Sequence, residues 1–166
     1  VEALFTIDEE TGMTGAMGLE GGLLEGEILL NLDTEDDDEI TIGCAGGIDV
    51  TARGSYTPEA APGNHRAFRI DIKGLTGGHS GMDIHRGRGN ANKLVNRVLL
   101  DAGELGIRVA SIDAGGLRNA IPREGSAIVL VAEDRLDDFH AYIKDQVATL
   151  SAEYKTTDPN LELLLQ

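Results

Sequence analysis

The 166-residue sequence has few aromatic side chains, no tryptophan and a single cysteine. One cysteine, Cys44, rules out an internal disulfide framework and is compatible with a reducing compartment. Long hydrophobic runs are absent as well, and none approaches the roughly 20 residues that cross a membrane. Function classes that depend on a membrane span or on a disulfide scaffold are therefore not expected.

Positive charge is also scarce, because 14 lysines and arginines stand against 29 aspartates and glutamates, a formal net charge of −15 at pH 7. A chain this acidic is repelled by nucleic-acid phosphates and by anionic membrane surfaces, so we expect neither as a partner. We expect a soluble, cytoplasmic protein. The chain opens at Val1 inside a strand-like run, which we interpret as a piece of a longer protein.

The first 46 residues carry a strand, helix, strand pattern. Val1–Thr6 and Glu27–Asp33 are apolar runs with a soft helical stretch between them, and a βαβ unit of this kind favours a parallel sheet covered by helices. Glu9 and Glu10 follow the first strand, and Asp33 ends the second. Because ligands bind at the carboxyl ends of such strands, these carboxylates are predicted to share one edge and to suit a divalent metal.

Each acidic group also has a simpler interpretation. Thr6-x-x-Glu9 fits a capping box, so Glu9 and Glu10 could belong to a helix start. Asp33 could belong to the acidic run at 35–39, which reads as a polar loop. A further strand is predicted at Glu39–Cys44, and we place a domain boundary between residues 46 and 47.

Residues 47–166 are predicted to fold as a ferredoxin-like sandwich, an antiparallel sheet with two helices on one face. The first two strands are counted as one extended arm of a β-α-β-β-α-β order. An RNA-recognition module shares this topology, but it needs basic charge and stacking aromatics. The predicted strands are 48–55, 67–73, 108–113, 126–132 and 161–165, and the helices are 91–105 and 134–154.

Two unusual loops interrupt this pattern. The first, 74–90, is rich in glycine, which permits positive φ and close backbone approach, so we expect His79 on an exposed, tightly turned loop. The alternative is a flexible turn in which the histidine is incidental. The second loop, 115–124, contains Asn119 and ends in Ile-Pro-Arg-Glu. His65, His85, Lys93 and His140 receive no role.

The motifs of this chain, and the order in which they occur, resemble those of a known family, the aminoacyl-histidine dipeptidases (peptidase D). These belong to the two-zinc metallopeptidases, with carnosinase, aminoacylase and carboxypeptidase G. The resemblance covers nearly the whole chain. Its motifs are Thr6-x-x-Glu9-Glu10-x-Gly12, Asp33 after an apolar strand, Gly43-Cys44-Ala45-Gly46-Gly47, Gly77-Gly78-His79-Ser80-Gly81, Gly87-x-Gly89-Asn90-Ala91-Asn92-Lys93 and Leu117-Arg118-Asn119-Ala120-Ile121-Pro122-Arg123-Glu124.

The resemblance implies a zinc-binding catalytic domain, of which residues 1–46 are a fragment, and a lid and dimerisation domain at 47–166. Glu9 falls on the general base, Glu10 on a zinc ligand and Asp33 on a ligand of the second zinc. Two zinc ions are implied for each active site of the full-length parent, with cobalt or manganese as possible substitutes. The implied partners are a dipeptide substrate and a second copy of the chain.

In the lid, the resemblance places His79 and Asn119 on residues that bind substrate and stabilise the oxyanion, His79 reaching into the partner subunit's site. Arg118 and Arg123 are candidates to hold a substrate carboxylate, although an arginine beside a proline-ended loop is equally often structural. Asp83 stands where many aminoacylase-like relatives carry proline, which fits the dipeptidase branch.

Only two of five expected metal ligands are present, so this chain alone is expected to bind zinc weakly and to hydrolyse nothing. Three hypotheses stay open. In the first, the full-length parent is a zinc dipeptidase that cleaves Xaa-His dipeptides, with other N-acyl amino acids or amides as alternative substrates. Alternatively, the chain acts only as a dimerisation and lid module. In the third, it is an amino-acid-binding regulatory domain.

Overall fold

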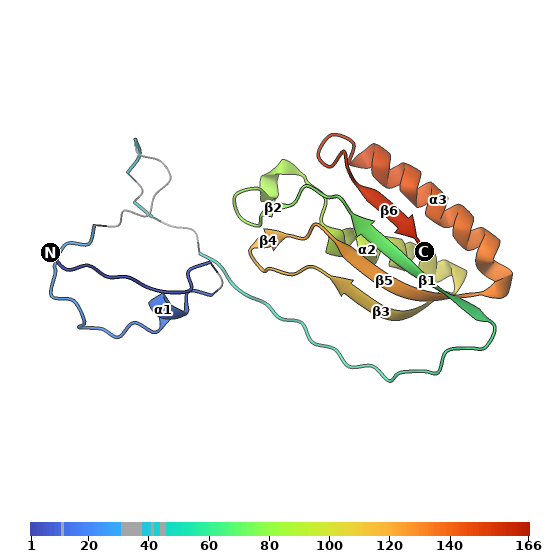
Figure 1. The fold of residues 1–166 in the computed structure, drawn as a ribbon, viewed down its shortest axis with the longest axis horizontal. Coiled ribbons are helices and arrows are strands. Elements are labelled where there is room, and N and C mark those ends of the chain that lie inside the picture. The colour runs from blue at the N-terminus through green and yellow to red at the C-terminus, as the bar shows by residue number, and fades with distance from the viewer. Residues whose placement is uncertain (11, 31–37, 41, 44–45) are drawn as a thin grey trace. The chain divides into compact units, whose positions relative to one another are not determined.

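The computed structural model describes residues 1–10, 12–30, 38–40, 42–43 and 46–166. The chain divides into two compact units, Val1–Gly54 and Ser55–Gln166 (Figure 1). None of the helices in the described residues is long and apolar enough to cross a membrane.

The second unit contains an antiparallel sheet of four strands in the order β3-β5-β1-β6. This order and the sequence of elements confirm the predicted β-α-β-β-α-β sandwich (Figure 1). The elements are β1 (His65–Lys73), α2 (Ala91–Ala102), β3 (Arg108–Ala114), β5 (Gly125–Ala132), α3 (Leu136–Glu153) and β6 (Glu162–Leu165). Short 3-10 turns lie at η1 (Ile84–Arg86), η2 (Gly103–Leu105) and η3 (Glu133–Arg135).

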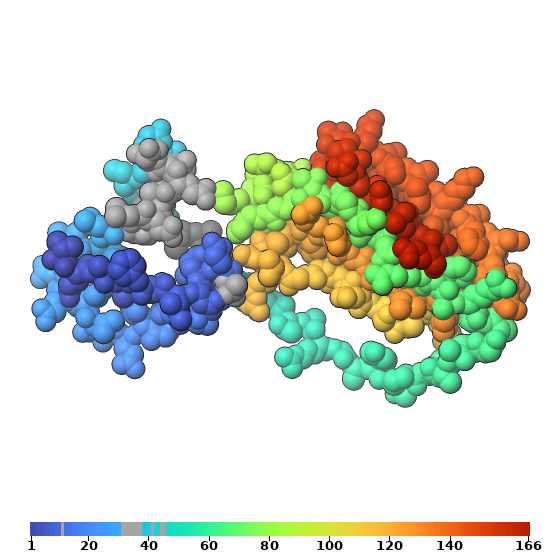
Figure 2. Space-filling view, viewed as in Figure 1, coloured from blue at the N-terminus to red at the C-terminus, as the bar shows by residue number. Residues whose placement is uncertain are grey.

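Both helices cover one face of this sheet because the sequence places apolar side chains at matching periods. Alternate residues of β1 and β5 point into the core, as expected for half-buried strands. One stripe of α2 and one of α3 meet them. The buried core consists of Ile70, Ile72, Leu75, Ala91, Leu94, Val95, Val98, Leu99, Ala102, Ala127, Val129, Val131, Phe139, Ile143, Leu150 and Leu163. Figure 2 shows the atoms of β1 (green) and β6 (red) next to each other on the face of the second unit turned towards the viewer.

A second, two-stranded sheet pairs β2 (Gly78–His79) with β4 (Ala120–Ile121). It was not predicted, because each strand has only two residues and lies in a segment that reads as loop. This small sheet joins the two unusual loops of the sequence.

The predicted βαβ unit is wrong for the described residues of the first unit. Val1–Thr6 and the described part of Glu27–Asp33 form no strand, and the only regular element there is α1 (Thr14–Met17). Phe5 and Ile28 are 90% and 83% exposed, so these apolar runs lack the neighbouring strands that a parallel ladder requires. Asp33 itself, with Cys44, lies outside the described residues.

The predicted strand at 48–55 is wrong for the same reason. The segment is exposed throughout and pairs with no other strand that the structure describes. The sandwich therefore takes its first strand from β1 alone, which begins at His65 rather than at residue 67.

Candidate functional site

The two unusual loops come together at the β2–β4 pair. Gly78 pairs with Ile121 and His79 with Ala120. Beyond this pair, the amide of Ser80 donates to the carbonyl oxygen of Asn119 over 2.9 Å. Two segments about 40 residues apart in the chain thus form one surface, with His79 and Asn119 on it.

Glycine is required at two positions of the first loop. Gly77 and Gly78 have φ values of +69° and +140°, which other residues rarely adopt. A Cβ atom on Gly77 would overlap the side-chain stem of Arg123, and one on Gly78 would lie 2.6 Å from Oδ2 of Asp83. The glycines therefore let the two loops and the Asp83 carboxylate approach the backbone, as the composition of the loop predicted.

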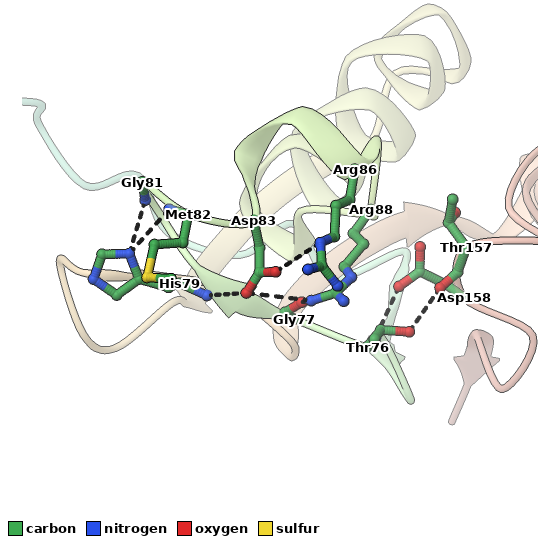
Figure 3. Close-up of polar contacts among 10 residues, drawn as sticks. All are labelled: Thr76, Gly77, His79, Gly81, Met82, Asp83, Arg86, Arg88, Thr157 and Asp158. Atoms are coloured by element: carbon green, nitrogen blue, oxygen red, sulfur yellow. Dashed lines mark hydrogen bonds and ion pairs between the residues drawn. The ribbon is translucent and has the colours of Figure 1, made fainter. Parts of the chain in front are cut away.

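The side chain of His79 is exposed, as predicted, and its ring is held by its own loop (Figure 3). Nδ1 accepts hydrogen bonds from the amides of Gly81, at 3.1 Å, and Met82, at 3.2 Å. An imidazole nitrogen that accepts a hydrogen bond carries no hydrogen, so two donors at Nδ1 suit the ring tautomer that has its hydrogen on Nε2. His79 is thereby arranged to donate a hydrogen bond through Nε2.

Asp83 closes the turn that carries His79. Its Oδ2 accepts from the backbone amide of His79 at 2.9 Å, and its own amide donates to the carbonyl of His79 at 3.0 Å. Arg86 Nε lies 3.0 Å from Oδ1, and Arg88 Nη1 lies 3.5 Å from Oδ2 (Figure 3). The His79 amide is the largest influence lowering the pKa of Asp83 below its usual range; desolvation opposes it, and the two guanidinium groups add to it.

Arg88 and Arg123 tie the same loop to its surroundings. Arg88 Nη1 donates to the carbonyl of Gly77 at 2.6 Å, and Arg123 Nε donates to the carbonyl of Leu75 at 3.1 Å. Arg123 therefore has a structural contact, the alternative that the sequence left open. Arg118, which is exposed, and Asn119 lie on the second loop. Other residues of the same loop, Arg123 among them, line a cavity of about 280 Å³.

Asp158 anchors both ends of the first loop and was missed by the sequence analysis. It is 1% exposed, and its two oxygens accept from the amides of Thr76, at 2.8 Å, and Gly89, at 2.7 Å. Burial raises the pKa of the Asp158 carboxyl, but these bonds and the neighbouring threonine hydroxyls together hold that pKa below its usual value. Its only local signal is its place before Pro159, between a helix and the last strand.

The predicted metal ligands do not form a metal site in the part of the chain that the structure describes. Glu9 and Glu10 lie exposed in a turn of the first unit, and Asp33 is not among the described residues. No group of three or more His, Cys, Asp or Glu side chains among the described residues could hold a metal ion. The described residues thus do not fit a zinc centre on their own. The capping-box alternative is wrong as well, since α1 begins at Thr14.

The chain matches known proteins along nearly its whole length. It is 46% identical over 166 residues to the cytosol non-specific dipeptidase of Escherichia coli (strain K12), covering 99% of this chain and 34% of the relative. Its structure matches that of aminoacylhistidine dipeptidase from Vibrio alginolyticus with a TM-score of 0.74 and 42% identity, over 96% of this chain and 33% of that one. The chain thus spans about a third of the length of these relatives.

A more distant structure shares the fold alone. An amidase of the hydantoinase/carbamoylase family from Burkholderia multivorans matches with a TM-score of 0.50 and 21% identity, over 61% of this chain and 26% of that one. The family model that matches describes a peptidase dimerisation domain, and it covers residues 70–158. These residues hold α2, α3, the small β2–β4 sheet and most of the larger sheet, together with the His79 loop. The chain therefore belongs to the peptidase dimerisation domain family.

Proposed function

We propose that this chain is part of a cytoplasmic, zinc-dependent dipeptidase that hydrolyses Xaa-His dipeptides. The observation that carries the proposal is 46% identity to a cytosol non-specific dipeptidase along 99% of the chain. The 42% identity to an aminoacylhistidine dipeptidase supports histidine as the second residue of the substrate. Other N-acyl amino acids or amides are the alternative substrates.

The proposal divides the chain into two roles. Residues 1–46 belong to the catalytic domain, with Glu9 as the general base and with Glu10 and Asp33 as zinc ligands. A glutamate can accept the proton of an attacking water and deliver it to the leaving amine. The remaining zinc ligands would come from the part of the parent that this chain does not span. Residues 47–166 form the lid and dimerisation domain.

The lid is proposed to contact substrate through the surface made by the two loops. His79 presents its Nε2 hydrogen, and the side chain of Asn119 can supply an amide hydrogen. Both are neutral donors suited to the oxyanion that forms when water attacks a peptide carbonyl. Arg118 and Arg123 are proposed to hold the substrate carboxylate. Because Nε of Arg123 already donates to the carbonyl of Leu75, Arg123 would hold the carboxylate through its two terminal nitrogens.

The direct test is release of histidine from a Xaa-His dipeptide by the full-length parent. We expect release that stops when the metal is removed by a chelator and returns when zinc is added back. The reason is that water is the nucleophile in the proposed mechanism, and a metal site activates water at neutral pH. Histidine is measured by chromatography against time.

Two results would limit or contradict this proposal. No release by the zinc-loaded parent would move the substrate to another acylated amino acid or an amide. The 166-residue chain serves as the control and is expected to release nothing, because the described residues form no metal site. Zinc-dependent release by this chain would contradict the proposed division of the active site.

We also propose that two copies of the chain associate through this domain. The match to a dimerisation domain supports this, and β3 is an edge strand whose residues are exposed except for half-buried Ala114. An unpaired edge offers backbone donors and acceptors to a second strand. Sedimentation at micromolar concentration is expected to show a dimer. A strict monomer at every concentration tested would count against the proposal.

A further inference from the structure

Asp83 stands out among the described residues because both its carboxylate and its backbone amide contact His79. Its carboxylate bonds the amide of His79 and pairs with Arg86 and Arg88. Arg88 in turn binds the carbonyl of Gly77, just before the turn. Asp83 and Arg88 have side chains that are only 20% and 18% exposed, so this network is partly shielded from solvent.

The turn from 79 to 83 is closed by two hydrogen bonds, and both involve Asp83. One runs from the His79 amide to the carboxylate, and the other from the Asp83 amide to the His79 carbonyl. Closure folds the intervening backbone over the imidazole, so that the amides of Gly81 and Met82 both point at Nδ1 (Figure 3). The ring orientation thus depends on the turn, and the turn depends on Asp83.

The chemical consequence concerns which ring nitrogen carries the hydrogen. Two amide donors at Nδ1 are compatible only with a ring that has its hydrogen on Nε2. Such a ring donates a hydrogen bond outward and has no free acceptor nitrogen for a proton from water. A donor is what a developing oxyanion needs, whereas a second base would compete with Glu9.

We propose that Asp83 is a positioning residue that fixes His79 as an Nε2–H donor by closing the turn around its ring. The use of this donor on an oxyanion rests on the proposed function; the state of the ring does not. All the residues that form this arrangement lie in one short segment, from the paired glycines before His79 to Arg88.

The first experiment reads His79 directly in the 166-residue chain labelled with ¹⁵N. Long-range ¹H–¹⁵N spectra are expected to show His79 with hydrogen on Nε2 and none on Nδ1; a His79→Gln spectrum identifies its signals among the four histidines. Hydrogen exchange of the Gly81 and Met82 amides is expected to quicken roughly 5- to 10-fold in Asp83→Ala, the effect of losing about one net hydrogen bond.

Asp83→Asn guards against a variant that fails to fold, since it keeps one oxygen for the His79 amide while losing the charge that pairs with Arg86 and Arg88. Asp145→Asn is the matched control, because Asp145 is exposed on α3 and distant in sequence from the loop. It should leave His79 and both amides unchanged. Hydrogen on Nδ1 in the unsubstituted chain would overturn the proposal, and so would unchanged amide exchange in both Asp83 variants.

The second experiment uses the full-length parent. Asp83→Ala is expected to lower kcat by about tenfold with KM changed less than twofold, because an oxyanion donor acts mainly in the transition state. A rise in KM with unchanged kcat would overturn the positioning role. A parent that releases no histidine from any dipeptide would count against the proposed function only, since the spectra report the ring without hydrolysis.

Discussion

Replacing Asp158 with alanine is expected to lower the free energy of unfolding of the Ser55–Gln166 unit by roughly 2–5 kcal/mol. The amides of Thr76 and Gly89 would each lose the acceptor that they have in the native fold. An amide donor left unsatisfied in the interior costs about 1–3 kcal/mol. Urea unfolding followed by tyrosine fluorescence measures the change, because all three tyrosines lie in this unit and there is no tryptophan.

The effect of Asp158 should also depend on pH. Its pKa in the folded chain is held below the ordinary value of 3.8, so the ionised carboxylate stabilises the fold above the pKa of the unfolded chain. This contribution is lost as the pH falls through the folded pKa. The difference in unfolding free energy between the unsubstituted chain and Asp158→Asn is therefore expected to be largest near pH 7 and to shrink below about pH 4.

Asp145→Ala is the control for both measurements, because Asp145 is exposed. A change of less than about 0.5 kcal/mol is expected there, as for most surface substitutions. If Asp158→Ala were equally mild, or if its cost did not fall with acid, the carboxylate would not be the anchor of the glycine-rich loop.

Replacing Glu9 with glutamine in the full-length parent is expected to reduce kcat for Xaa-His hydrolysis by roughly 10²- to 10⁴-fold. Glutamine has nearly the same shape but cannot accept a proton, so the attacking water would lose its base. Zinc content, measured on the same sample, is expected to be unchanged, since Glu10 and not Glu9 is the proposed ligand. Retention of metal separates loss of the base from loss of the centre.

Glu20→Gln provides the matched control in the same unit, because Glu20 is an exposed glutamate outside the proposed site. Its kcat should stay within a factor of two of the unsubstituted enzyme. Full activity of Glu9→Gln would remove Glu9 from the mechanism. Loss of zinc together with activity would instead assign Glu9 to the metal.

Local patterns predicted the second unit well because its elements bury their own periodic faces. The apolar stripe of α2 repeats over three turns, and Asn90 caps the helix through a side chain that accepts from the Lys93 amide. The alternation of β1 placed Ile70 and Ile72 in the core. The same patterns failed in the part of residues 1–54 that the structure describes, since an apolar run becomes a strand only where other strands pair with it.

The sequence by itself determined the order of the strands and helices that form the sandwich and marked the two loops that carry His79 and Asn119. Only the tertiary structure decided that these loops pair, that Asp83 closes the turn around the imidazole and that Asp158 anchors both ends of the first loop. Thr76 and Asp158 are 82 residues apart, and the local periodicity of a sequence does not predict a hydrogen bond over that separation. Such contacts depend on how the sheet brings distant segments together, and a linear pattern does not contain that arrangement.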